Sequence, residues 1–128
     1  MTRRAAVHVV FAALALALAA GACTGREADV AALTHGGNAN HGKGLIRAYG
    51  CGACHTIPGV RGALSTVGPD LAGVASRAYV AGVTPNTPEN LMRWIRNPQA
   101  VDDKSAMPNL DVSERDARDI AAYLYTLK

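Results

Sequence analysis

Aromatic side chains are scarce in this sequence. They make up 5% of the 128 residues, and the single phenylalanine, Phe11, lies among the first 22 residues. A domain of about 100 residues buries roughly two-thirds of the surface of its unfolded chain, and aromatic residues usually supply much of that apolar area. The core must therefore be built from leucine, valine and isoleucine, or be completed by an apolar group that the sequence does not encode.

Charged residues are also sparse, at 18% of the chain. Beyond residue 22 the lysines are Lys43, Lys104 and Lys128, and acidic and basic residues nearly balance. This composition argues against a nucleic-acid-binding protein, which needs a basic patch to neutralise phosphates. Internal repeats and the alternating apolar pattern of β-strands are absent as well, which favours a mostly helical domain.

The long hydrophobic run of the sequence lies near its start. Residues 5–20 are apolar except for His8, with two arginines before them and small residues after them. A basic start, an apolar run and a small-residue cleavage site are typical of a secretory signal peptide. The run is shorter than the roughly 20 apolar residues of a membrane-spanning helix. We therefore expect residues 1–22 to be an export signal.

The rest of the chain divides into a tether and one domain. Residues 23–41 show no sustained apolar period and end in a stretch rich in glycine and asparagine, which predicts a flexible arm. The domain is expected to occupy residues 42–128. Within it, glycine and proline are dense between residues 56 and 86, which indicates irregular loop instead of long regular elements.

Apolar spacing predicts three helices in this domain. A short one precedes Gly50, and a second is capped by Thr87 and ends before Pro98. The third follows Ser113, which begins a sequence that resembles a capping box. Its apolar residues recur at helical spacing and are Ala117, Ile120, Ala121, Leu124 and Leu127.

The sequence Cys51-Gly-Ala-Cys54-His55 directly follows the first of these helices. The pattern C-x-x-C-H is the attachment signature of a c-type haem. Two thiols three positions apart on a helical turn can each reach one vinyl group of a porphyrin, and the next residue can bring its imidazole to the iron. We therefore predict one covalent haem c held by Cys51 and Cys54, with His55 as the proximal ligand.

Three other interpretations of the cysteine pair are weaker. A structural zinc site needs four ligands, and the other candidates, Cys23, His35 and His41, crowd into or beside the expected arm. A thioredoxin-like redox pair follows a strand, yet no strand pattern precedes Cys51. A disulfide between Cys51 and Cys54 would close a very small loop and stabilise little.

A covalently held haem has either a second axial ligand or an open site, and this difference separates electron carriers from haem enzymes. Two methionines lie beyond residue 22. Met92 falls beside the apolar face of the second helix, where methionine commonly fills a core. Met107 lies in a loop, which can bring its thioether to the far face of a haem more readily. We predict His55 and Met107 as the iron ligands.

Residues 42–128 resemble the class I cytochrome c family. The resemblance rests on the haem motif, on Gly68-Pro69-Asp70-Leu71 after it, and on Met107. It implies that the Pro69 carbonyl accepts the proton of the proximal imidazole, which would fix the orientation of that ring. It places Arg77 and Ser105 near the haem propionates and Trp94 among the haem-binding residues.

The family resemblance also implies a fold and a function. The fold is all-α, with about three main helices and loops wrapped around the haem, and the first and last helices cross where Gly42 or Gly44 meets Tyr123. The implied activity is transfer of single electrons, without catalysis and without a small-molecule substrate. Residues 86–98, taken together with Ser105–Pro108 and the last helix, are especially similar to cytochrome c domains fused or associated with subunit II of bacterial haem-copper oxidases. This similarity suggests a terminal oxidase as acceptor.

Other functions remain open at this point. The domain could be the haem subunit of a quinol-oxidising complex or of a periplasmic dehydrogenase, or a structural subunit of a larger complex. If Met107 does not bind the iron, it could be an open-site haem enzyme or a gas sensor.

The position of Cys23 suggests how such a domain would meet its partners. Cys23 follows a small-residue sequence and looks like the lipidated cysteine of a bacterial lipoprotein. We therefore expect attachment to the outer, periplasmic face of the cytoplasmic membrane. A flexible arm after Cys23 would span about 23 Å and would raise the effective concentration of membrane-bound redox partners. With so few lysines, strong electrostatic steering to an acidic partner is not expected.

Overall fold

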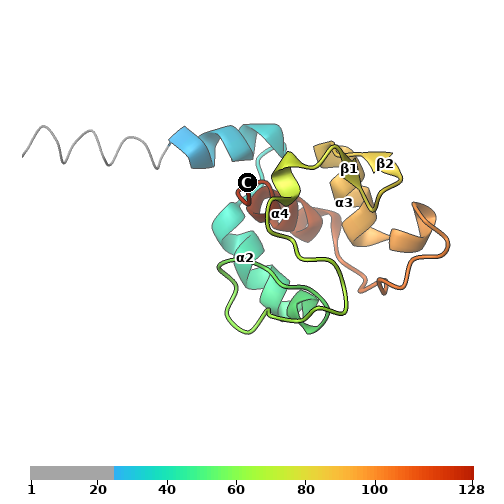
Figure 1. The fold of residues 1–128 in the computed structure, drawn as a ribbon. Helices are drawn as coiled ribbons and strands as arrows, with labels where there is room; N and C mark the ends of the chain where they lie inside the picture. Colours follow the sequence, from blue (N-terminus) through green and yellow to red (C-terminus); the bar gives the residue numbers. More distant parts are fainter. Residues whose placement is uncertain (1–24) are drawn as a thin grey trace, which may run out of the picture.

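The computed structural model describes residues 25–128, so the expected export signal and Cys23 lie outside the described residues. The described chain is mainly helical, as predicted, with little strand (Figure 1). In chain order its elements are a helix at residues 25–33, α2 (Ala39–Ala48), η1 (Cys51–Ala53), η2 (Val74–Ser76), β1 (Tyr79–Val80), β2 (Thr84–Pro85), α3 (Pro88–Arg96), η3 (Pro98–Ala100) and α4 (Glu114–Leu124).

The helix boundaries follow the capping residues that the sequence provides. The hydroxyl of Thr87 accepts a hydrogen bond from the N–H of Asn90 at 3.3 Å, and Pro88 occupies the first turn of α3. The hydroxyl of Ser113 accepts from the N–H of Asp116 at 3.1 Å. These bonds satisfy N–H groups that have no partner inside the helix. All three helices predicted from the sequence are confirmed.

Helices α2 and α4 cross at Gly42. A Cβ atom on Gly42 would lie 1.8 Å from the backbone oxygen of Asp119, so only glycine permits this approach. Gly44 has open space around it and takes no part in the crossing. The three atoms closest to such a Cβ atom belong to the backbone of Asp119 and Ile120, and Tyr123, the partner implied by the resemblance, is not among them. The Tyr123 hydroxyl instead donates to the carbonyl of Pro58 at 2.7 Å.

The described core is almost entirely aliphatic. Its largest fully buried side chains include Ile46 and Ile57. The inward face of α4 buries four of the five apolar residues predicted for it, whereas Leu127 lies beyond the end of the helix. Tyr125 is the exception, at 7% exposure, and its hydroxyl donates to Asn86 at 3.0 Å. Burial, together with the nearby charge of Glu89, raises the pKa of Tyr125 to about 12.

Two predictions about irregular regions need correction. The segment expected to be a flexible arm is helical over residues 25–33, and α2 already begins at Ala39. Val30 and Thr34 in this segment are buried. No strand was predicted from the sequence either, yet β1 and β2, each two residues long, pair in an antiparallel arrangement. Among residues 25–128, none of the helices has the length and apolar character needed to cross a bilayer.

Candidate haem site

The cysteine motif forms a tight turn at the end of α2. Gly50 adopts a left-handed conformation with φ of 72°, which redirects the chain into η1. The N–H groups of Cys54 and His55 then both donate to the carbonyl of Cys51, at 3.2 and 3.0 Å. Gly52 packs so closely that a Cβ atom there would lie 2.9 Å from Ala63. The turn therefore holds both cysteines and the histidine in one short, compact segment.

Both thiols of the motif are free and half-buried. Burial raises the pKa of the Cys51 thiol. Two neighbouring thiols that form no disulfide are available for covalent attachment of another group. In the part of the chain that the structure describes, no cluster of three or more histidine, cysteine or acidic side chains is placed to hold a metal ion.

One nitrogen of the His55 imidazole is fixed by a hydrogen bond to the backbone. Its Nδ1 donates to the carbonyl of Pro69 at 2.7 Å, which is the contact that the resemblance implied. Because Nδ1 carries the proton in this bond, the lone pair of the neutral ring lies on Nε2 and is available to bind a metal. The carbonyl of Pro69 thereby sets both the tautomer and the orientation of the ring.

Gly68 lets the backbone pass directly over the histidine ring. A Cβ atom on Gly68 would lie 2.7 Å from Cε1 and 2.9 Å from Nδ1 of His55. The N–H of Gly68 also donates to the carbonyl of Cys54 at 2.6 Å, and that of Leu71 donates to Thr56 at 2.9 Å. Backbone hydrogen bonds thus connect the segment around Pro69 to the cysteine motif and the residue after it.

Arg77 acts on this same loop. Its Nη2 donates to the carbonyl of Asp70 and to that of Ala72, the latter at 3.1 Å. Asn86 in turn donates to the carbonyl of Arg77 at 3.0 Å. The structure therefore shows Arg77 as a support for the backbone after Pro69. Asn86 was not predicted as a site residue, because nothing in the neighbouring sequence indicates its contact with a residue nine positions earlier.

The loop that carries Met107 is stabilised by two polar side chains. The hydroxyl of Ser105 accepts from the N–H of Met107 at 3.1 Å, and its own proton remains free to donate. Gln99 donates to the carbonyl of Met107 at 2.7 Å and to that of Ser105 at 3.3 Å. These bonds fix the backbone around a half-buried Met107. Gln99 is a second residue that sequence analysis did not single out.

Helix α3 places Met92 and Trp94 against the core. Both side chains are partly buried and pack against the hydrophobic cluster. The interpretation of Met92 as a packing residue is therefore confirmed.

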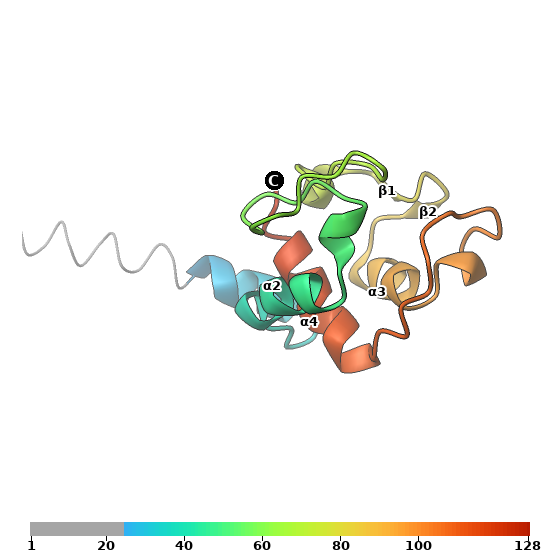
Figure 2. The same ribbon diagram turned by 90° about the horizontal axis from the view of Figure 1, so that it is seen from below.

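In Figure 2 the green segment after α2 and the orange loop between α3 and α4 lie on the same side of α4.

Large apolar side chains remain exposed next to the cysteine motif. Leu64 is 78% exposed and Val67 is 81% exposed, and both lie in the loop between His55 and Pro69. The backbone of Leu64 forms an isolated bridge with Thr56, beside His55. Exposed apolar area of this kind costs free energy, about 25 cal/mol for each Å² that could be buried. Free thiols, an available imidazole nitrogen and uncovered apolar side chains together fit a covalently attached haem.

Comparison with known proteins agrees with this chemistry. The model of the family described as cytochrome c matches residues 39–128. The chain belongs to the cytochrome c family. A cytochrome c domain carries covalently bound haem c and transfers electrons, which confirms the class I cytochrome c fold and the cofactor expected from the cysteine motif.

A curated relative extends the comparison. Over 91 residues the cytochrome domain is 36% identical to a protein of Alkalihalophilus pseudofirmus named cytochrome c oxidase subunit 2. The match covers 70% of this chain but 26% of that protein, so the chain corresponds to about a quarter of its relative. No solved structure matches the chain.

Proposed function

We propose that this cytochrome c is a membrane-attached, single-haem electron carrier that delivers electrons to a terminal oxidase. The observation that carries the proposal is the combination of a cytochrome c domain with similarity to a protein named as an oxidase subunit. The lipoprotein-like Cys23 and the signal-like residues before it support attachment at the periplasmic face of the cytoplasmic membrane.

In this proposal four residues bind the cofactor directly. Cys51 and Cys54 would hold the haem through thioether bonds, and His55 and Met107 would bind its iron. When bound, the haem supplies an iron that alternates between the ferric and ferrous states. The soft thioether of Met107 favours the ferrous state, which raises the reduction potential relative to a site with two histidines.

The remaining site residues keep this arrangement rigid. Pro69 and Gly68 orient the imidazole of His55, and Arg77 holds the loop behind them. Ser105 and Gln99 hold the backbone of Met107. A rigid ligand set suits electron transfer, because a site that does not rearrange between oxidation states loses little energy to reorganisation. We assign Trp94 to the wall of the haem site.

The decisive experiment measures electron delivery in native membranes. Membranes from cells that contain the full chain should oxidise the reduced cytochrome through an oxidase that cyanide inhibits. Membranes with Cys23→Ser should lose the cytochrome to the soluble fraction and slow this oxidation, while the protein keeps its haem. Mass spectrometry of the N-terminus checks the modification. Full oxidation rates with a released, unmodified protein would contradict the membrane attachment, and cyanide-insensitive oxidation would contradict the acceptor.

A further inference from the structure

The residues before the family domain are part of the folded unit. The family match begins at residue 39, yet residues 25–37 pack on the domain through buried side chains. Val30 is 7% exposed and Thr34 is fully buried, and the hydroxyl of Thr34 donates to the carbonyl of Val30 at 2.7 Å. In Figure 1 this helix, drawn in blue, extends along the side of the molecule near the end of α4.

Gly37 is where the segment comes closest to α4. A Cβ atom on Gly37 would lie 2.7 Å from the backbone oxygen of Arg118 and 2.9 Å from the Cβ atom of Ala122. It would also lie 2.6 Å from the hydroxyl of Thr34. Such distances leave no room for a side chain, so the docking depends on glycine at this position.

Polar contacts join the segment to all three helices of the domain. Arg26 donates to the carbonyl of Thr126 beyond the end of α4 at 3.4 Å, and Glu27 accepts from Asn40 in α2 at 3.2 Å. The Nε2 of His35 donates to Glu89 at the start of α3 at 2.8 Å, and this bond lowers the pKa of Glu89. Each such surface contact contributes little by itself. Together they hold the segment near both ends.

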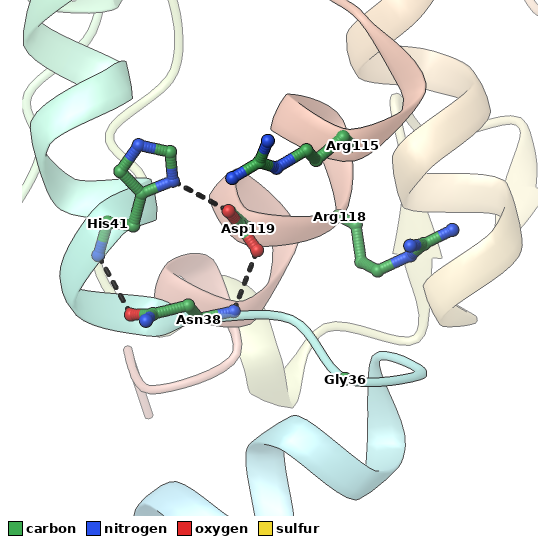
Figure 3. A pocket seen from close by; sticks show the side chains of 6 residues that line it. All are labelled: Gly36, Asn38, His41, Arg115, Arg118 and Asp119. Carbon is green, nitrogen blue, oxygen red and sulfur yellow. Dashed lines mark hydrogen bonds and ion pairs between the residues drawn. The ribbon is translucent and has the colours of Figure 1, made fainter.

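A buried polar contact fixes the junction between this segment and α2 (Figure 3). The buried carboxylate of Asp119 accepts from the N–H of Asn38 at 2.8 Å and from Nδ1 of His41 at 2.7 Å. Burial alone raises the pKa of Asp119, but these two bonds and the charge of Arg115 outweigh burial and lower it. A hollow of about 470 Å³ lies beside this junction, and none of its lining residues belongs to the proposed haem site.

We propose that residues 25–37 form a rigid brace that restricts the orientations of the haem domain relative to its membrane attachment. The inference rests on the attachment at Cys23 suggested under the proposed function. Only two residue steps separate Cys23 from residue 25, which is a reach of at most about 7 Å. The flexible arm expected from the sequence would span about 23 Å instead.

The brace affects how the haem domain encounters a membrane-bound redox partner. A domain on a long flexible arm samples many orientations and heights above the bilayer, whereas a braced domain stays close to its anchor and samples fewer of them. The exposed side of the brace carries Arg26, Glu27 and Asp29, together with Leu33 at 48% exposure. One exposed leucine among charged residues does not form the broad apolar face of a helix that lies in the membrane surface. It therefore acts as a spacer between membrane and domain.

Hydrogen exchange of the purified full chain tests the docking independently of any membrane. The amides of residues 25–37 should be protected in the wild type. Gly37→Ala should reduce their protection by about ten- to a hundredfold, because the added methyl group forces the segment off α4. Gly25→Ala is the matched control, since a Cβ atom there meets nothing within 4 Å. Unprotected amides in the wild type would overturn the proposal.

Linear dichroism of the haem band in oriented membranes tests the orienting role. The wild type should show a clear dichroism, and Gly44→Ala should keep it. Insertion of Gly-Ser-Gly-Ser between residues 24 and 25 leaves the brace intact but frees the domain, so the dichroism should fall towards zero. Unchanged dichroism in the insertion variant would overturn the proposal. Complete release of the wild type from membranes would overturn the attachment, and the orienting role with it, but would leave the exchange result standing.

Discussion

The helical scaffold and the haem-facing loops are built on different principles. Where α2 crosses α4, glycine and backbone meet without a gap, and the side chains around Ile46 and Ile120 are buried. In the loops around the cysteine motif, by contrast, Leu64 and Val67 are mostly exposed. The scaffold buries its own apolar side chains, whereas the loops leave large apolar side chains exposed beside the cysteine motif.

This difference separates the sources of stability and function. Changes in the scaffold should alter the free energy of unfolding and leave the haem chemistry intact. Changes in the loops should alter the haem and affect the scaffold less. The following predictions test this separation, from the largest expected effect to the smallest.

The largest effect is expected from Cys51→Ala combined with Cys54→Ala. Without both thiols no thioether bond can form, so acid–acetone extraction should remove all pigment from the protein. Cys23→Ser is the control, because it also removes a cysteine but lies outside the domain, and its pigment should stay with the chain. Pigment that resists extraction in the double variant would contradict the assignment.

Met107→Ala should open the iron to external ligands. Loss of the thioether leaves His55 as the single protein ligand, so carbon monoxide should change the spectrum of the reduced protein strongly at neutral pH, and the reduction potential should fall. Met92→Ala should show neither change, since Met92 packs on the core. A strong carbon monoxide response in the wild type would show instead that the site is open.

Gly42→Ala should destabilise the scaffold. The new methyl group would collide with the Asp119 carbonyl, and overpacking of this kind costs about 1–3 kcal/mol or more in the free energy of unfolding. Gly44→Ala places the same change two residues away in open space and should raise stability by up to about 1 kcal/mol. Denaturant unfolding measures both variants, and equal stabilities would contradict the crossing described above.

Asp119→Asn should have a smaller, pH-dependent effect. Hydrogen bonds to a charged group contribute about 1.5–3 kcal/mol, so the variant should be less stable by about that amount at neutral pH. Because folding lowers the pKa of Asp119, the wild-type advantage should be complete above the unfolded pKa of about 3.9 and should shrink as pH falls further. Unfolding curves between pH 3 and 7 measure this trend, with exposed Asp103→Asn as the control. A constant difference would contradict the lowered pKa.

Local signals in the sequence predicted a large part of this protein. The cysteine motif, the capping residues Thr87 and Ser113 and the apolar face of α4 depend on neighbours within a few residues, so they can be recognised in the sequence alone. The contact between His55 and Pro69 was also anticipated, but through the family resemblance. The spacing of His55 and Pro69 in the sequence does not by itself show that their side chain and carbonyl meet.

Only the tertiary structure decided the N-terminal segment and the helix crossing. Residues 25–37 contain only two large apolar residues, Val30 and Leu33, and three glycines, so their sequence resembles that of a flexible arm. The segment docks because Gly37 fits against α4, which lies about eighty residues later in the chain. The burial of Val30 and Thr34 likewise cannot be recognised from neighbouring residues. The choice of Gly42 over Gly44, and of Pro58 as the partner of Tyr123, likewise depends on surfaces that come together only on folding. The sequence by itself therefore determined the chemistry of the cysteine motif and the three helices of the domain. Long-range packing determined how these helices cross and whether the N-terminal segment docks on them.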